Sequence, residues 1–259
     1  MGSRAFIRFA LALVAASSGI GTSARAQDGG GLPFAVGERL LYEGRARGVG
    51  GRGAMWIEGP VDVRGVPTME LHFDFAARFG PVSVSQKTTS WLDASRMTAL
   101  RFSKRERNPL AHHDETVELF PEERRWKASD GEGGRSPSSA SLDELSFIYF
   151  IRTLPLRDDS LFSFSRHFDP DRSPTTVRVV GRERITTPAG TFATVLVEMR
   201  VRDAKHYKGE GSIRFAITDD RCRVPVRIES EVPGAGRVVL MLTEARSSLC
   251  APPSYTTVR

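Results

Sequence analysis

The sequence predicts a mainly β protein, in which a strongly curved antiparallel sheet (a half-barrel or open barrel) is wrapped on one α-helix. Three observations predict this fold class. Apolar and polar residues alternate with a period of two along most of the chain, short turn segments separate the alternating runs, and only one segment has helical periodicity. Roughly ten to twelve strands fit between the turns. Because no helices alternate with the strands, a parallel α/β sheet is excluded.

The chain of 259 residues begins with a predicted secretory signal peptide at residues 1–26. Arg4 and Arg8 give it a positive start, an apolar stretch follows, and Ala24–Ala26 forms a small-x-small cleavage site. The alternative, a membrane anchor, needs about 20 apolar residues, which the stretch does not reach. Removing the leader takes away three arginines and lowers the net charge from +6 to +3. We therefore expect a periplasmic or secreted protein that does not span the membrane.

The mature chain is predicted to be a single β-rich domain at residues 33–249 with a short C-terminal tail at 250–259. Two turn segments, Thr187–Thr191 and Pro233–Gly236, are short enough for antiparallel hairpins. The alternation that defines the strands is clearest at residues 69–75, 194–202, 213–217, 224–228 and 238–242.

One segment departs from the β pattern and is predicted to be a helix. Ser141 and Glu144 form an S-x-x-E capping box at its start, and Pro155 stops it after Leu154. The preceding residues 129–141 are rich in Gly, Ser and Pro and are predicted to form a loop. The apolar positions with helical spacing are Leu142, Leu145, Ile148, Tyr149 and Ile151.

The predicted helix is too small to cover the predicted sheet. Ten strands spaced ~4.8 Å apart make a sheet about 48 Å wide. A helix of about 13 residues is ~20 Å long and ~10 Å across, so it covers two or three strands. Curling of the sheet, a second sheet or a bound apolar molecule must hide the remaining apolar face. A curled sheet on one helix is the simplest solution, and it leaves open either an empty slot beside the helix or a filled core.

Four segments, taken in order, resemble an exported bacterial family catalogued as domain of unknown function 3108. They are the first strand at 33–42, the helix at 143–156, the hairpin at 187–192 and the late strand at 219–226. The resemblance implies an envelope setting and a shape similar to that of lipoprotein-carrier half-barrels, which is an analogy of fold only. It brings no reaction, no cofactor and no catalytic residue.

Cys222 and Cys250 are the only two cysteines of the chain. In an exported protein such a pair is predicted to form a disulfide, the alternative being two separate thiols. The bridge would close a loop of about 29 residues and stabilise the fold by ~3.6 kcal/mol on the chain-entropy model.

Sequence motifs for catalysis, nucleotides and metals are weak or missing. The glycines at 48, 50 and 53 match G-x-G-x-x-G, but no helix follows, so a flexible hairpin loop is predicted. The segment His112–Glu115 is interpreted as a polar turn and not a metal site, because neighbouring strand residues face opposite ways. We expect no cofactor. Nucleophile-elbow and zinc-peptidase motifs do not occur, which makes an envelope hydrolase the third choice of function.

Basic residues cluster at 101–107 and at 124–127 and would form a basic stripe on two neighbouring strands. An anionic envelope surface is a possible partner for such a stripe, and nucleic acid is excluded for an exported chain of low net charge. The alternative is that the charges protect strand edges from aggregation.

Three residues are candidates for binding a ligand. Arg152 lies in the last helical turn, where it either pairs with a carboxylate of the sheet or holds the acidic head of a ligand. Tyr149 and Trp91 are either core residues or ligand contacts. The predicted function is a non-catalytic binder of an apolar or lipid-like molecule or of an envelope partner. The alternatives are a structural envelope protein with a filled core and the hydrolase.

Overall fold

A computed structural model describes residues 31–46, 49–108, 111–202, 210–232 and 236–249 of the chain. The predicted signal peptide at 1–26 and the predicted tail at 250–259 lie outside these residues. Among the described helices, none combines the length and the apolar character that a membrane-spanning helix needs.

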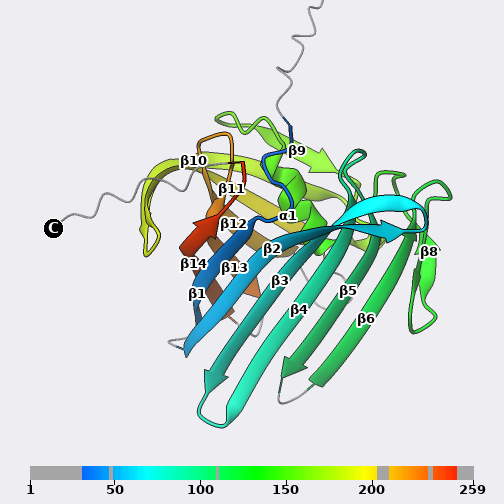
Figure 1. Ribbon diagram of the computed structural model, residues 1–259, viewed down its shortest axis with the longest axis horizontal. Coiled ribbons are helices and arrows are strands. Elements are labelled where there is room, and N and C mark those ends of the chain that lie inside the picture. Colours follow the sequence, from blue (N-terminus) through cyan, green and yellow to red (C-terminus); the bar gives the residue numbers. More distant parts are fainter. Residues whose placement is uncertain (1–30, 47–48, 109–110, 203–209, 233–235, 250–259) are drawn as a thin grey trace, which may run out of the picture. The chain divides into compact units, whose positions relative to one another are not determined.

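The described residues contain fourteen strands in one antiparallel sheet, with one α-helix inside its curve (Figure 1). This confirms the predicted fold class, although the strands outnumber the ten to twelve expected. The elements are β1 (Arg39–Ala46), β2 (Val49–Val63), β3 (Val66–Phe79), β4 (Val82–Asp93), β5 (Thr98–Asn108), β6 (Ala111–Phe120), β7 (Arg125–Ala128), β8 (Gly133–Arg135), α1 (Glu144–Arg152), β9 (Leu161–Phe164), the 3-10 turn η1 (Pro170–Arg172), β10 (Thr175–Thr187), β11 (Gly190–Arg202), β12 (Glu210–Thr218), β13 (Pro225–Val232) and β14 (Gly236–Arg246).

The sheet consists of two meanders, and the first strand of one pairs with the last strand of the other. β1 to β8 follow one another in space, as do β9 to β14, and β1 pairs with β14 between them. In this pairing Arg39 lies opposite Arg246 and Ala46 opposite Val238. The sheet does not close, because β8 and β9 are its two edges. The pairing of Thr187 with Gly190 confirms one predicted hairpin.

The helix begins at a different residue from the one the sequence predicts. Asp143, not Ser141, is the N-cap, and its carboxylate accepts hydrogen bonds from the backbone N–H groups of Leu145 and Ser146. The Ser146 hydroxyl in turn accepts the N–H of Asp143. This reciprocal pair satisfies the first orphan donors of the helix, so the predicted box of Ser141 and Glu144 is wrong by two residues. The helix ends at Arg152, before Pro155.

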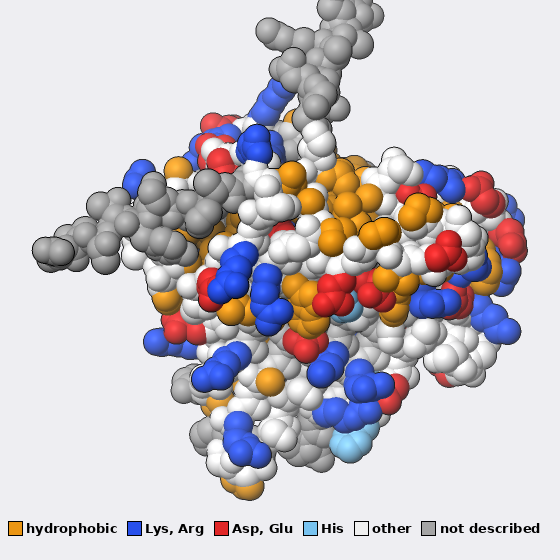
Figure 2. All heavy atoms as spheres, in the orientation of Figure 1, with side chains coloured by type: hydrophobic (Ala, Val, Ile, Leu, Met, Phe, Trp, Pro, Cys, Tyr) orange, Lys and Arg blue, Asp and Glu red, His pale blue; other side chains and the backbone are white. Residues whose placement is uncertain are grey.

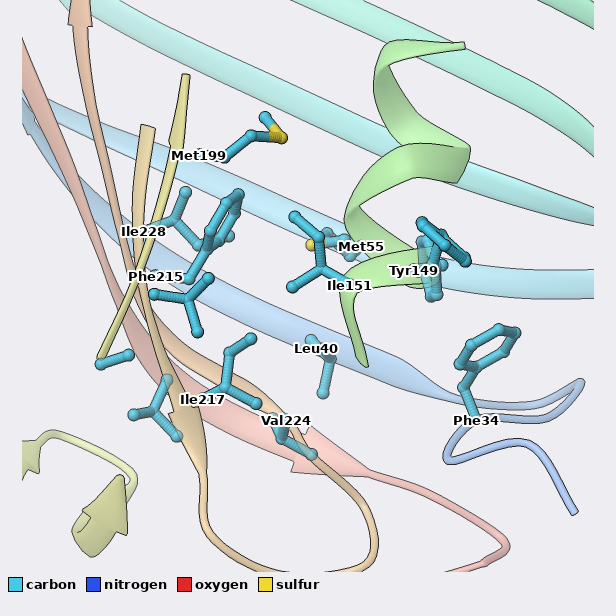
Figure 3. Packing of buried hydrophobic residues seen from close by; sticks show 14 of the residues in the cluster. Phe34, Leu40, Met55, Tyr149, Ile151, Met199, Phe215, Ile217, Val224 and Ile228 are labelled. Atoms are coloured by element: carbon cyan, nitrogen blue, oxygen red, sulfur yellow. The ribbon is translucent and has the colours of Figure 1, made fainter. Parts of the chain in front are cut away.

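The main core surrounds the helix from both meanders. Ile151 points toward Phe215 of β12, and Tyr149 points the other way, toward Phe34 (Figure 3). α1 approaches β3 and β4 most closely. A second, smaller core between β5, β6, β7 and the η1 region contains Ala99, Phe102, Val117, Leu119, Trp126, Ala128 and Phe168.

Three segments predicted to be loops or turns are strands instead. The glycine-rich segment from residue 50 to 53 belongs to β2, residues 112–115 belong to β6, and residues 133–135 form β8. Gly48 lies outside the described residues. Gly44 and Gly51 are required for packing, because a Cβ on either would lie 3.0 Å from the ring of Phe75. The sequence pattern misses this packing because a glycine carries no apolar side chain to count.

Candidate functional site: the concave face around the helix

Arg152 ties the end of α1 to the sheet through a buried ion pair. Its guanidinium donates to both carboxylate oxygens of Glu38, at 2.6 and 2.8 Å, and both side chains are excluded from solvent. Further hydrogen bonds reach the carbonyl oxygens of Pro33 and Cys222. Burial alone would lower the pKa of Arg152, but the Glu38 carboxylate raises it above its ordinary value, so the guanidinium stays charged. The sequence predicts two alternative roles for Arg152, and pairing with a carboxylate of the sheet, as seen here, is one of them.

Tyr149 lies beside this ion pair and is fully buried. Its ring meets Phe34 edge to face, with centroids 5.0 Å apart, and the Arg152 guanidinium lies over both rings. Among the described residues the Tyr149 hydroxyl has no hydrogen-bond partner. Burial raises its pKa far above the ordinary value, so the hydroxyl remains a donor. The structure thus brings Tyr149 and Arg152 together, and a ligand-binding role for them stays a prediction.

Trp91 lies on the other side of the sheet. In β4 its neighbours Ser90 and Leu92 are buried on the core side, whereas Trp91 is half-exposed beneath the guanidinium of Arg101, 5.5 Å from its ring centroid. Tyr149 and Trp91 therefore do not share a site. The alternation of β4 is regular here, because Ser90 and Leu92 are both buried and the bulge opposite them adds Leu100 to β5 instead.

A charged group lies at the start of the helix. The Lys104 ammonium contacts Glu144 at 3.0 Å and Glu106 at 3.1 Å, and Arg172 also pairs with Glu144. Burial alone would lower the pKa of Lys104, but the two carboxylates raise it above its ordinary value. Burial alone would raise the pKa of Glu144, but Lys104, Arg172 and His167 hold it well below its usual range.

Asp143 is a buried carboxylate next to this group. Its side chain accepts a hydrogen bond of 2.5 Å from the Ser90 hydroxyl in addition to its capping bonds. Burial raises the pKa of Asp143 to about 6, and these hydrogen bonds only partly oppose the increase. Its side chain caps α1 and fixes the cap to Ser90 of β4, which indicates a structural role.

Beyond the helix, the apolar side chains on the concave face of the sheet are only half-buried. We call these half-buried apolar side chains the open apolar face. On α1, Ile148 is the half-buried apolar residue, and Glu144, one turn earlier, is half-buried too. The members packed at the rim of the core are Phe73, Phe75, Ile148, Val201, Ile213 and Val238. Sequence alternation indicates which way the strand members point, but it does not show that the helix stops short of covering them.

A hollow of about 710 Å³ lies at the ends of β1 to β4. Three arginines, Arg45, Arg52 and Arg78, line it, and strand alternation places them on the outer side of the sheet, opposite the open apolar face. A second hollow, of about 340 Å³, lies beside Trp126 and η1. Neither of these two hollows lies between α1 and the sheet.

The predicted basic stripe is not formed by neighbouring strands. β6 separates the basic residues of β5 from those of β7. Its own carboxylates pair with the arginines of β5, Asp114 with Arg107 and Glu118 with Arg101. Figure 2 accordingly shows charges of both signs interspersed on the outer face of the first meander. A role of this face toward an anionic envelope surface stays a prediction.

The predicted disulfide involves a residue outside the described part of the chain. Cys222 is buried between β12 and β13, while Cys250 is among the residues not described. The carbonyl of Leu249 accepts a hydrogen bond from Arg221, so the chain neighbours of the two cysteines are in contact. The bridge stays a prediction.

Comparisons with known proteins agree with this architecture. The profile of a family described as "Protein of unknown function (DUF3108)" matches residues 51–243, which confirms the resemblance stated above. A β-barrel-like protein of the DUF1849 family from Brucella abortus is similar over 83% of this chain and 98% of its own, with a TM-score of 0.56 and 14% identity. At that identity the likeness shows the fold alone.

Two further solved structures are more distant. A protein described as exported, with a YmcC-like fold, from Bacteroides fragilis has a TM-score of 0.34 and 11% identity over 83% of this chain and 98% of its own. One described as a lipoprotein, from Parabacteroides distasonis, has a TM-score of 0.31 and 12% identity over 83% and 99%. No curated protein matches the chain.

Proposed function

Since the chain belongs to the DUF3108 family, whose function is unknown, we propose a function from its own geometry: the protein is an exported, non-catalytic binder of one apolar or lipid-like molecule. The single observation that carries the proposal is the open apolar face, an apolar surface inside the curve of the sheet that α1 leaves half-buried.

The open apolar face offers a place for an acyl chain. Removing apolar surface from water contributes about 25 cal/mol for each Å² buried, so half-buried phenylalanine and isoleucine side chains favour a flexible apolar partner. Phe73 and Phe75 of β3 lie on one side of this face and Ile213 of β12 on the other, with Ile148 of α1 as part of its border. Small-molecule sites commonly occur at the mouths of β-barrels, and this sheet is curved like an open barrel.

The proposed location is the periplasm or the exterior of the cell. It rests on the predicted signal peptide at 1–26. Fatty acids and phospholipids of the envelope are lipid-like molecules that fit this proposal.

Titration with a fluorescent fatty acid tests the proposal. The mature chain should enhance the emission of the probe at a stoichiometry of one. Ile148→Glu places a charge on the open apolar face and should weaken binding at least ~10-fold, the equivalent of about 1.4 kcal/mol. Val180→Glu is the matched control, because Val180 is an exposed apolar residue on β10. No enhancement, or equal loss in both variants, would contradict the proposal.

A structural envelope protein is the second candidate, and one observation favours it. The helix side of the concave face is filled, since Arg152, Tyr149 and Ile151 are almost completely buried. If the probe does not bind while the fold is intact by circular dichroism, this candidate takes first place.

A further inference from the structure

We propose that Glu58, Glu70 and His72 form a binding site for a divalent transition-metal ion of the zinc class on the outer face of the sheet. This site is separate from the open apolar face, and it does not depend on the function proposed above.

The register of β2 and β3 brings the three side chains together. Glu58 lies directly opposite Glu70, and Trp56 directly opposite His72. Because strand residues two apart share a face, all four side chains project to the same side. The residues between them, Ile57 and Leu71, are buried in the core, so this shared side is the outer one.

The distances suit coordination by a single ion. One ligand atom from each residue can be chosen so that all lie within 4.8 Å of one another. His72 Nε2 is 3.4 Å from Glu58 Oε2 and 3.8 Å from Glu70 Oε2. Ligand atoms at about 2.1 Å from a tetrahedral zinc ion lie roughly 3.4 Å apart. Small rotations of the two carboxylates would therefore complete the geometry.

His72 is held as a metal-binding histidine usually is. Its Nδ1 lies 3.2 Å from the hydroxyl of Thr89, which can accept a hydrogen bond from Nδ1–H and so leave the lone pair of Nε2 free for a metal ion. Trp56 stacks on the ring at 4.6 Å, with an interplanar angle of 10°. Nε2 is shielded from solvent and has no hydrogen-bond partner among the described residues. Its environment therefore fixes the imidazole and aims its unused nitrogen at two carboxylates.

The charge balance of the site also calls for a cation. Two carboxylates directly opposite each other on neighbouring strands repel. Within the described part of the chain, neither Glu58 nor Glu70 lies within ion-pair distance of a lysine or arginine, and His72 is their shared neighbour. One imidazole and two carboxylates form a three-ligand set that zinc accepts, with a fourth position left for water. Protonation of His72 is the competing way to satisfy both carboxylates, and the experiment separates the two.

The test measures metal binding to the tag-free mature chain after treatment with a chelator. Equilibrium dialysis at pH 7.5 with zinc should give one ion bound per chain. Cobalt, which is paramagnetic, should quench the part of the tryptophan emission that comes from Trp56, and Trp56→Phe should abolish this quenching while zinc still binds.

The variants locate the site. His72→Asn and Glu70→Gln should each weaken zinc binding at least ~10-fold, as should Glu58→Gln, whose side chain is 62% exposed and so is not needed for folding. The matched control is His113→Asn, because within the described residues the His113 imidazole has a single carboxylate, that of Glu115, within ion-pair distance, at 3.7 Å. Absence of stoichiometric zinc binding, or equal binding by Glu58→Gln and the wild type, would overturn the proposal and leave protonated His72 as the partner of both carboxylates.

Discussion

At the scale of single residues, a buried ion pair defines how the helix meets the sheet. Arg152 joins Glu38 ahead of β1, the Pro33 carbonyl and the Cys222 carbonyl near β13. The sequence predicted that Arg152 would meet either a carboxylate or a ligand, since a basic residue on an apolar helical stripe needs a partner. It could not identify Glu38 as that partner, because 114 positions separate the two residues.

Removing one member of the pair should be far more harmful than removing both. Arg152→Met leaves the Glu38 carboxylate buried and unpaired, which should lower the free energy of unfolding by about 3–5 kcal/mol. The double variant Glu38→Leu/Arg152→Met should recover a large part of that loss. Urea denaturation of the wild type, of Arg152→Met, of Glu38→Leu and of the double variant completes this double-mutant cycle. Additive losses would show that the two charges do not depend on each other.

Asp143 should make stability depend on pH in a defined direction. Burial raises its pKa from 3.8 to about 6 in the folded state. Between these values the folded chain holds a proton that the unfolded chain lacks. The contribution of this residue is therefore complete below about pH 4 and is lost as the pH rises through 6, a change of up to about 3 kcal/mol.

The comparison with Asp143→Asn isolates this effect from other titrating groups. Asparagine can still cap the helix but does not ionise. When the pH falls from 7 to 4, the unfolding free energy of the wild type should rise relative to that of the variant. A constant difference across this range would contradict the raised pKa.

At the scale of elements, the sequence predicts type better than boundaries. The apolar spacing identifies the helix. Two overlapping capping patterns stand at its beginning, one starting at Ser141 and one at Asp143, and a local motif does not decide which of these two side chains caps the backbone N–H groups. For the glycines of β2, the sequence gives the wrong type of element. They resemble a loop in sequence, but they lie in a strand, where Gly51 makes room for Phe75 of the neighbouring strand β3.

Two adjacent glycines of β2 provide a matched test of that packing. A Cβ at Gly51 would meet the Phe75 ring and the Ala76 carbonyl oxygen at 3.0 Å, whereas a Cβ at Gly50 would meet nothing within 4 Å. Gly51→Val should lower the free energy of unfolding by about 1–3 kcal/mol. Gly50→Val should leave it unchanged or raise it. Thermal denaturation checks both, and equal effects would refute the close approach of Phe75.

At the scale of the whole molecule, the sequence predicts a curved sheet around one helix but not its closure pattern. The pairing of β1 with β14 depends on a register between chain ends, and no hairpin sets it. The same limit applies to the metal site, because the E-x-H pattern in β3 is visible in the sequence but the position of Glu58 opposite it is not.

The predicted disulfide would tie the start of β13 to the end of the chain after β14. Mass spectrometry of the alkylated, unreduced protein should show neither Cys222 nor Cys250 modified, and reduction should lower the free energy of unfolding by ~3.6 kcal/mol. Alkylation of both thiols without reductant would exclude the bridge.

Native mass spectrometry of the protein purified from the periplasm of its own host shows whether the open apolar face carries a ligand. We expect a one-to-one complex with a lipid-like molecule that organic extraction recovers as a fatty acid or phospholipid, and a reduced amount of it on Ile148→Glu. A ligand-free mass for gently isolated wild-type protein, with no uptake of added fatty acid, would contradict the claim that the open apolar face is a binding site.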